Sequence, residues 1–321
     1  MKNKAILLFI PLFFYCSLSA QMIVTEEPVE QQTSVGKIYG SLKVPASKSK
    51  IPVALIVAGS GPTDRNGNQP NMQNNSLKML SDGLYYNGIA TLCFDKRKIG
   101  ESKDIKQDET DVRIEDFAKD VEGWVNILSL DKRFSEIIII GHSEGSLIGM
   151  LAINNNKKVN KFVSLAGSGK PMNEILKDQL SERLKGQPQA VTDMIFSYIE
   201  KLEKGETISD VPPSLSALFR PSVQPYLISC FKYNPQTEIS KLNIPVLIVQ
   251  GTTDIQVSIE HAELLSKANP KAKKGVIENM NHVLKKCEST DLQSQLVTYS
   301  NPKLPLETSI VKTISDFIKE K

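Results

Sequence analysis

The 321-residue sequence is poor in cysteine and close to neutral, and each scarcity excludes a class of protein. It has four cysteines, of which Cys16 lies in an N-terminal segment that we expect to be removed. The remaining Cys93, Cys230 and Cys287 are odd in number, so they do not form a disulfide framework, although a Cys230–Cys287 pair stays open. The formal net charge is +3 and no basic stripe is present, which argues against nucleic acid as a partner.

The glycines, cysteines and histidines also lack the spacing of two common kinds of site. There is no G-x-G-x-x-G and no Gly-Lys-Ser/Thr, so the glycine-rich segments are poor candidates for phosphate binding. No group of cysteine and histidine suggests a metal ion, and we expect no cofactor. Repeats and low-complexity tracts are absent, and the composition is that of an ordinary globular protein.

Residues 1–20 have the three-part pattern of a secretory signal peptide. Two lysines come first, an apolar run follows from Ala5 to Tyr15, and small residues end at Ala20. Pro11 and the shortness of the run argue against a transmembrane helix, which needs about 20 apolar residues. We therefore predict cleavage after Ala20, export to the periplasm or beyond, and no stable insertion in a membrane.

Short apolar runs alternate with amphipathic stretches along most of the chain. Most of the runs are apolar on both faces, as in a parallel sheet that helices cover. Between them, residues 113–130 and 258–268 carry apolar side chains three or four apart, which indicates helices. The alternation predicts an α/β fold with a mostly parallel sheet flanked by helices, and residues 36–45 as an antiparallel edge strand. The predicted parallel strands are residues 53–59, 89–95, 136–142, 162–167, 246–251 and 275–280.

One long segment, residues 170–239, interrupts this alternation because it contains no strand-like run. It has two helical stretches, residues 174–186 and 190–205, followed by a proline-rich stretch. A loop of this length within a compact domain is unusual unless it forms a lid or a small subdomain. We therefore predict a helical cap at residues 170–239, inserted into a core made of residues 21–169 and 240–321.

The pentapeptide Gly-His-Ser-Glu-Gly at residues 141–145 joins an isoleucine-rich strand to an apolar helical stretch. Strand, Gly-x-Ser-x-Gly and helix in this order predict a nucleophile elbow. Its tight turn requires a strained backbone at Ser143, while Gly141 and Gly145 avoid Cβ clashes between strand and helix. The Ser143 hydroxyl would stand at a helix N-terminus, where the helix dipole favours a developing oxyanion.

A catalytic serine requires a base and an acid that orients the base. The sequence has three histidines. We expect the side chain of His142 to point away from the reacting face, and His261 to take an exposed polar role on its helix. His282 and Asp254 each follow an apolar run, in loops at strand ends where catalytic residues are common. The chain order Ser143, Asp254, His282 matches that of elbow-type hydrolases, and we predict these residues as the catalytic triad.

The loop after the first predicted parallel strand is a candidate for part of an oxyanion hole. Residues 57–68 read VAGSGPTDRNGN, and glycines flank Ser60, so the backbone can pass close to a ligand. In an elbow hydrolase this loop supplies one oxyanion N–H, and the residue after the nucleophile supplies the other. We predict the backbone N–H groups of Ser60 and Glu144 as the two donors.

Four features of the sequence resemble the α/β-hydrolase superfamily, and more narrowly the bacterial esterase D type of carboxylesterase. They are AGSGPTDRNGN (58–68), FDKRKIGES (94–102), GHSEGS (141–146), and GTTDIQV with NMNH (251–257 and 279–282). The resemblance covers nearly all of residues 35–321 and implies an α/β-hydrolase fold with a cap between the sixth and seventh strands. It also implies a Ser143–Asp254–His282 triad and hydrolysis of simple carboxylic esters, often with short acyl groups. Lys98 stands where relatives usually have glycine, so we expect the loop around it to differ in shape.

Four apolar residues of the cap are candidates for the lining of an acyl pocket. The alternative is that they only pack the cap onto the core. These residues are Phe219, Tyr226, Leu227 and Phe231.

Two other functions remain open on the sequence alone. A serine aminopeptidase or acyl-peptide hydrolase would need an acidic or aromatic site for the substrate's amino group, for which Glu144, Asp64 and Asp95 are candidates. All three also have structural interpretations as capping or turn residues. A non-catalytic binding protein on the same fold is disfavoured by the intact serine, aspartate and histidine in order, and acyl transfer to an acceptor other than water stays open.

Overall fold

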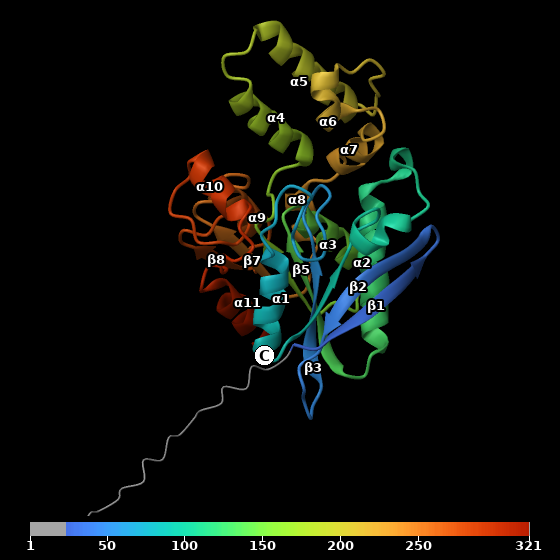
Figure 1. The fold of residues 1–321 in the computed structure, drawn as a ribbon, viewed down its shortest axis with the longest axis vertical. Helices are drawn as coiled ribbons and strands as arrows, with labels where there is room; N and C mark the ends of the chain where they lie inside the picture. Colours follow the sequence, from blue (N-terminus) through green and yellow to red (C-terminus); the bar gives the residue numbers. More distant parts are fainter. Residues whose placement is uncertain (1–23, 321) are drawn as a thin grey trace, which may run out of the picture.

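The computed structural model describes residues 24–320, in which an eight-stranded sheet is covered by helices on both faces (Figure 1). The strand order is β1-β2-β4-β3-β5-β6-β7-β8, and only the pairings of β2 with β1 and β4 are antiparallel. The strands are β1 (Glu26–Thr33), β2 (Gly36–Lys43), β3 (Ile51–Val57), β4 (Ala90–Phe94), β5 (Phe134–His142), β6 (Lys161–Leu165), β7 (Val246–Gly251) and β8 (Lys273–Ile277). This architecture confirms the predicted fold class, and the six predicted parallel strands are β3 to β8. The predicted signal peptide lies outside the described residues.

Helices on the two faces of the sheet form two separate hydrophobic cores. One core lies under α2, α3 and α9, and the other lies under α1 and α11, which sit side by side in Figure 1. The helices that cover the sheet are α1 (Ser76–Tyr86), α2 (Ile114–Leu130), α3 (Glu144–Asn155), α9 (Ile259–Ala268) and α11 (Ile310–Lys319). The chain also contains α10 (Leu292–Tyr299) and the short 3₁₀ helices η1 (Gly100–Asp104), η2 (Glu109–Asp111) and η3 (Pro213–Leu215).

The isoleucine run of β5 shows why the central strands of the sheet are apolar on both faces. Ile137 and Ile139 belong to the core under α2 and α3, whereas Ile138 and Ile140 belong to the core under α1 and α11. Successive side chains of a strand point to opposite faces, so a central strand with a helix layer on each side needs apolar residues throughout.

The predicted edge strand is not at the edge of the sheet. Strand β2 pairs with β4 on one side and with β1 on the other, so β1 is the edge. The sequence of β1, EEPVEQQT, is mostly polar, and its side chains alternate largely between exposed and half-buried positions. Its strand pattern is therefore weak, and Pro28 is typical of an edge strand because it lacks an N–H for a second neighbour.

A group of helices between β6 and β7 lies together above the sheet in Figure 1. Tyr198, Ile199, Leu202 and Phe219 are among the residues of its own small hydrophobic core. These helices are α4 (Met172–Arg183), α5 (Gln189–Glu203), α6 (Ser216–Phe219) and α7 (Gln224–Phe231). These helices follow the sixth strand and precede the seventh, as in the predicted fold class.

The last helix of the predicted cap, α8 (Pro235–Ser240), packs with the sheet domain instead. Ile239 is fully buried in the core under α2, α3 and α9, and its carbonyl accepts a hydrogen bond from Asn269. The domain limits stay a prediction, and this packing would end the cap before α8. Within residues 24–320, no helix combines the length and the hydropathy needed to cross a bilayer.

Candidate active site

The turn that carries Ser143 has the strained geometry expected of a nucleophile elbow. Strand β5 ends at His142, helix α3 begins at Glu144, and Ser143 between them has φ 55° and ψ −123°. A Cβ on Gly141 would lie 2.3 Å from the carbonyl oxygen of Gly145. A Cβ on Gly145 would lie 2.3 Å from that of Val57. Both glycines are therefore required by close backbone contacts, as the sequence predicts.

His282 and Asp254 form a buried hydrogen-bonded pair, although 28 residues separate them in the chain. Asp254 follows β7 and His282 follows β8, and neighbouring parallel strands bring their carboxyl ends together. Nδ1 of His282 lies 2.8 Å from Oδ2 of Asp254, and the two residues are 5% and 7% exposed. Since Asp254 accepts at Nδ1, the imidazole is oriented with Nε2 left for a further partner.

The surroundings of Asp254 keep it charged in spite of its burial. Burial by itself would raise the pKa of Asp254, but the nearby His282 and the hydrogen bonds to the carboxylate lower it below its usual value. Its Oδ1 accepts the backbone N–H groups of Gln256 at 2.8 Å and Val257 at 2.9 Å. Gln250 donates from Nε2 to Oδ2 at 3.0 Å. Four donors thus hold the carboxylate in one orientation toward His282.

His142 joins the elbow to the loop of His282 through a hydrogen bond of its side chain. Its Nε2 lies 2.9 Å from the carbonyl oxygen of His282, and the two imidazole rings are 5.0 Å apart. Burial, followed by the charge of His282, lowers the pKa of His142 to about 4. His142 is therefore neutral near pH 7 and donates from Nε2 to the carbonyl, so it fixes the loop that carries the predicted base.

The Ser143 hydroxyl completes no hydrogen bond within the part of the chain that the structure describes. Ser143 follows His142 directly, so it lies next to the His282 loop. Catalytic hydrogen bonds are often long without substrate and tighten when substrate binds. The triad of Ser143, Asp254 and His282 stays a prediction, to which the structure adds the paired acid and base and the strained turn.

The loop that contains Ser60 passes beside the nucleophile. A Cβ on Gly59 would lie 3.0 Å from Cβ of Ser143, so the two segments are in close contact. No acceptor in residues 24–320 binds the N–H of Ser60. Glu144 is the first residue of α3, and the first N–H groups of a helix have no acceptor within it. Two donors beside Ser143 are thus free for an oxyanion, and their role stays a prediction.

Replacing Ser60 separates its backbone from its side chain. Ser60→Ala keeps the N–H, so we expect kcat to stay within a few-fold of the unaltered protein. Ser60→Pro removes the N–H, and we expect kcat to fall by at least ~10²–10³-fold, the typical cost of one oxyanion donor. Steady-state kinetics with a p-nitrophenyl ester measures both variants.

Proline also fixes φ, so circular dichroism and the melting temperature of Ser60→Pro must match those of the unaltered protein. The decisive variant is Ser60→Ala. If a folded Ser60→Ala protein lost as much activity as Ser143→Ala, the Ser60 hydroxyl would take part in the chemistry, and its assignment as a backbone donor would be wrong.

His261 is buried, contrary to the expected exposed role. It is 7% exposed, and its Nδ1 accepts the N–H of Gly169 at 3.0 Å and lies 3.1 Å from the Ser168 hydroxyl. Burial, followed by the charge of Lys170, lowers the pKa of His261, which keeps its ring neutral and able to accept. His261 therefore holds the turn after β6, and it has no hydrogen bond to His282 or Asp254.

The four predicted pocket residues lie in two different surroundings. Phe219 and Leu227 are buried in the hydrophobic core of the cap itself, where Phe219 packs edge-to-face on Tyr198. Tyr226 packs edge-to-face on Phe117 of α2, and Phe231 contacts both the cap core and the sheet core. Their role in an acyl pocket stays a prediction, and only Tyr226 and Phe231 lie between cap and sheet domain.

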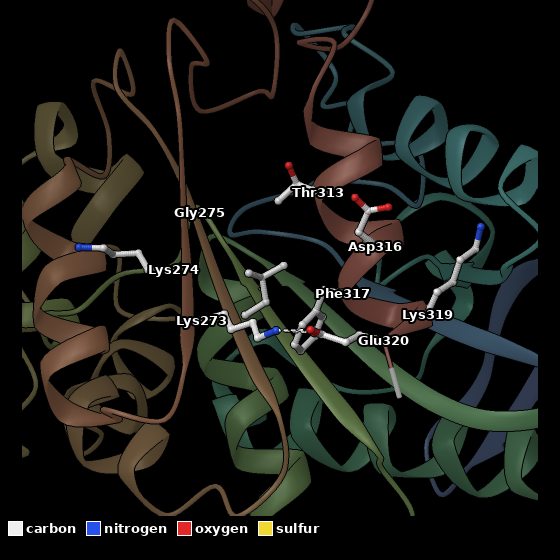
Figure 2. A pocket seen from close by; sticks show the side chains of 9 residues that line it. Lys273, Lys274, Gly275, Thr313, Asp316, Phe317, Lys319 and Glu320 are labelled. Carbon is white, nitrogen blue, oxygen red and sulfur yellow. Dashed lines mark hydrogen bonds and ion pairs between the residues drawn. The ribbon is translucent and has the colours of Figure 1, made fainter.

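The groove shown in Figure 2 is separate from the predicted site and has a different kind of lining. It has a volume of about 600 Å³ and lies between the edge strand β8 and helix α11. Lys273 and Glu320 form an ion pair across it, and Asp316 and Lys319 also line it. None of the predicted site residues lines this groove, and its charged lining does not suit an acyl chain.

Helix α10 supplies a buried link between the two loops of the acid and the base, which the sequence analysis missed. Gln295 is fully buried and donates from Nε2 to the carbonyl of Thr253 at 3.0 Å. Its Oε1 accepts a hydrogen bond from Asn281 at 3.1 Å. Thr253 precedes Asp254 and Asn281 precedes His282. The side chain of Gln295 therefore connects the loop of the acid to the loop of the base. Nothing in the local sequence around Gln295 signals this role.

Comparison with known families agrees with the fold of the chain. A family model described as the alpha/beta hydrolase fold matches residues 53–210. This segment begins in β3 and includes the elbow and the first two cap helices. The chain is an α/β-hydrolase fold protein.

This α/β hydrolase is a distant homologue of esterase EstD from Thermotoga maritima. The two are 26% identical over 259 residues, which is 79% of this chain and 60% of EstD. The chain thus spans less than two thirds of the length of that relative.

Solved structures share its fold. Est1E from Butyrivibrio proteoclasticus has a TM-score of 0.59 at 18% identity, over 91% of this chain and 99% of that one. The Pyrococcus furiosus esterase Pf2001 has a TM-score of 0.57 at 15% identity, over 92% and 91% of the two chains. At these identities the similarity shows the fold that these chains share.

Proposed function

We propose that this protein is an exported serine hydrolase that cleaves carboxylic esters through Ser143, His282 and Asp254. The observation that carries the proposal is the buried His282–Asp254 pair, joined at 2.8 Å, beside the strained turn of Ser143. A charged carboxylate on Nδ1 leaves Nε2 of His282 free to accept a proton, which is what an activated serine needs.

The proposed reaction has two halves. Nε2 of His282 accepts the hydroxyl proton as Oγ of Ser143 attacks the ester carbonyl, and the N–H groups of Ser60 and Glu144 bind the resulting oxyanion. Asp254 stabilises the imidazolium, which then protonates the departing alcohol and leaves an acyl-Ser143 ester. Water, deprotonated by His282, attacks this ester, and the acid is released as Ser143 regains its proton.

Esters with short acyl groups are the substrates that we propose. Support comes from the relatives EstD and Pf2001, each of which is named as an esterase. The aromatic side chains of Tyr226 and Phe231 at the boundary of cap and sheet domain offer an apolar surface of limited extent.

An aminopeptidase function has less support, because two of its three candidate acidic residues have other partners. Asp64 accepts the N–H groups of two following loop residues at 2.8 and 2.9 Å. Asp95 binds the guanidinium of Arg65 at 2.7 Å. Glu144 lies near Tyr226, whose pKa is raised by burial and then by the charge of Glu144. Asp64 and Asp95 therefore do not offer a free carboxylate for a substrate ammonium.

A substrate panel distinguishes the two functions. We expect the purified protein to hydrolyse p-nitrophenyl acetate and butyrate faster than the decanoate, and to react with a fluorophosphonate probe. Aminoacyl p-nitroanilides, with a free amino group, should be turned over at least about 100-fold more slowly. Faster cleavage of the anilides would favour the aminopeptidase, and acyl transfer would appear as an ester product when a second alcohol is added.

Export is proposed from the sequence of residues 1–20, with its basic start, apolar run and small-residue end. N-terminal sequencing of the protein recovered outside the cytoplasm should then begin at Gln21. Recovery of an uncleaved chain from the cytoplasm alone would contradict export without affecting the proposed chemistry.

A further inference from the structure

A buried lysine holds the loop of Ser60, and the proposed mechanism has not used it. Lys96 lies two residues after β4 and is 5% exposed. Its Nζ lies 2.5 Å from the carbonyl oxygen of Gly59 and 3.0 Å from that of Gly61. The amine thus binds the backbone on both sides of Ser60.

The surroundings of Lys96 disfavour a charged amine, so this residue lowers the stability of the folded state. Its Nζ lies 5.8 Å from the ring centre of Phe117, and no carboxylate in residues 24–320 lies within ion-pair distance. Burial lowers the pKa of Lys96, and the charge of Glu144 opposes this only in part. Burying an ammonium without a paired charge is unfavourable, so an apolar residue of similar length would suit the fold better.

The hydrogen bond from Lys96 to the Gly59 carbonyl determines where the Ser60 N–H points. The carbonyl of Gly59 and the N–H of Ser60 belong to one planar trans peptide, in which they point in opposite directions. Fixing the carbonyl toward Lys96 therefore fixes the N–H on the other side. Because Gly59 and Gly61 have no side chains, this peptide could otherwise rotate easily, and Gly61 has a φ of 70°.

We propose that Lys96 is a positioning residue of the oxyanion hole, which holds the Gly59–Ser60 peptide so that the Ser60 N–H faces the substrate carbonyl oxygen. The inference rests on the proposed function, because it assigns a role to Ser60 in ester hydrolysis. Lys96 acts through the backbone, and it does not touch the substrate. Its contribution is largest when the carbonyl oxygen carries the negative charge, so it should affect the transition state more than substrate binding.

Lys96→Met tests this role, because methionine keeps the length of the side chain and removes the donor. We expect kcat for p-nitrophenyl acetate to fall about 10²-fold, the cost of misplacing a catalytic group by about 1 Å, with KM within a few-fold. A trifluoromethyl ketone, which forms an oxyanion on the catalytic serine, should lose affinity by the same factor. Lys96→Gln, which retains an N–H donor, should lose less of both.

Lys161 provides a matched control, because its buried ammonium also binds backbone carbonyls. It is 8% exposed and donates to the carbonyls of Ile318 and Glu320, each at 2.6 Å. Lys161 begins β6, at the opposite end of the sheet from the predicted site. Lys161→Met should lower the melting temperature and leave kcat and the affinity for the ketone within a few-fold.

The results separate this inference from the proposed function. Parallel losses of kcat and ketone affinity in Lys96→Met, smaller in Lys96→Gln, would support the role of Lys96. Unchanged kcat, or a loss of kcat with unchanged ketone affinity, would overturn it while ester turnover by the unaltered protein stands. If Lys96→Met fails to fold, the same comparison is made with Lys96→Gln alone. Absence of both turnover and ketone binding in the unaltered protein would overturn the proposed function and this inference together.

Discussion

Ser143→Ala is expected to abolish both ester turnover and labelling by a fluorophosphonate. The loss in kcat should approach ~10⁶-fold, the scale measured when a member of a catalytic triad is removed. Its physical reason is that no acyl-enzyme forms without Oγ, so only direct attack by water remains. Initial rates with p-nitrophenyl acetate and gel-based detection of the probe measure the two effects.

The variant should keep the fold, which makes the test clean. Ser143 is half-buried, its hydroxyl has no hydrogen bond in residues 24–320, and alanine retains the Cβ that already occupies the turn at φ 55°. We therefore expect an unchanged melting temperature. Ser60→Ala is the matched control, since it removes another serine hydroxyl near the elbow. Substantial turnover by folded Ser143→Ala would contradict the serine-hydrolase proposal.

The elbow could be predicted because its causes are local. Gly141, Ser143 and Gly145 lie within five residues, and the clashes that require the glycines arise inside this turn or against the adjacent strand β3. The positions of Asp254 and His282 could also be predicted, because each lies in the loop that follows a parallel strand, Asp254 after β7 and His282 after β8. Parallel neighbours place such strand ends at one edge of the sheet, so the pair follows from topology.

The structural partners of these residues could not be predicted, because they join segments far apart in the chain. Lys96 binds carbonyls 37 and 35 residues before it, and Gln295 binds Thr253 at a separation of 42 residues. His261 looked exposed because its helix is amphipathic, yet the turn of Gly169 covers it. A polar residue that satisfies a buried backbone group has no local signature.

The loop around Lys98 illustrates a different limit. We expected a changed shape because glycine is replaced, but Lys98 has a φ of 67°, the left-handed conformation that a glycine favours. Its side chain is exposed, so lysine meets no clash beyond the backbone strain itself. The substitution therefore does not by itself require a different loop.

The three cysteines of the described chain are free and buried, which excludes the open Cys230–Cys287 pair in this structure.

His282→Ala is expected to be as damaging as Ser143→Ala, about 10⁶-fold in kcat, because serine and base act as one unit. Asp254 would be left without its partner at 2.8 Å, so some loss of stability should accompany the loss of rate. His261→Ala is the matched control, since it also removes a buried imidazole. It should lower the melting temperature and leave kcat within a few-fold. A larger loss of kcat in His261→Ala than in His282→Ala would show that the triad is wrongly assigned.

The double variant Ser143→Ala/His282→Ala gives the sharper form of this prediction. If His282 works by activating Ser143, removing it from a protein that already lacks the hydroxyl should cost almost nothing more, and the double variant should match either single one. Independent contributions would instead multiply, and the loss would exceed that of each single variant by orders of magnitude. Residual rates measured with a large excess of p-nitrophenyl acetate distinguish the two cases. A multiplicative loss would mean that His282 serves the reaction by another route than the proton of Ser143, and the mechanism proposed for this site would have to be abandoned.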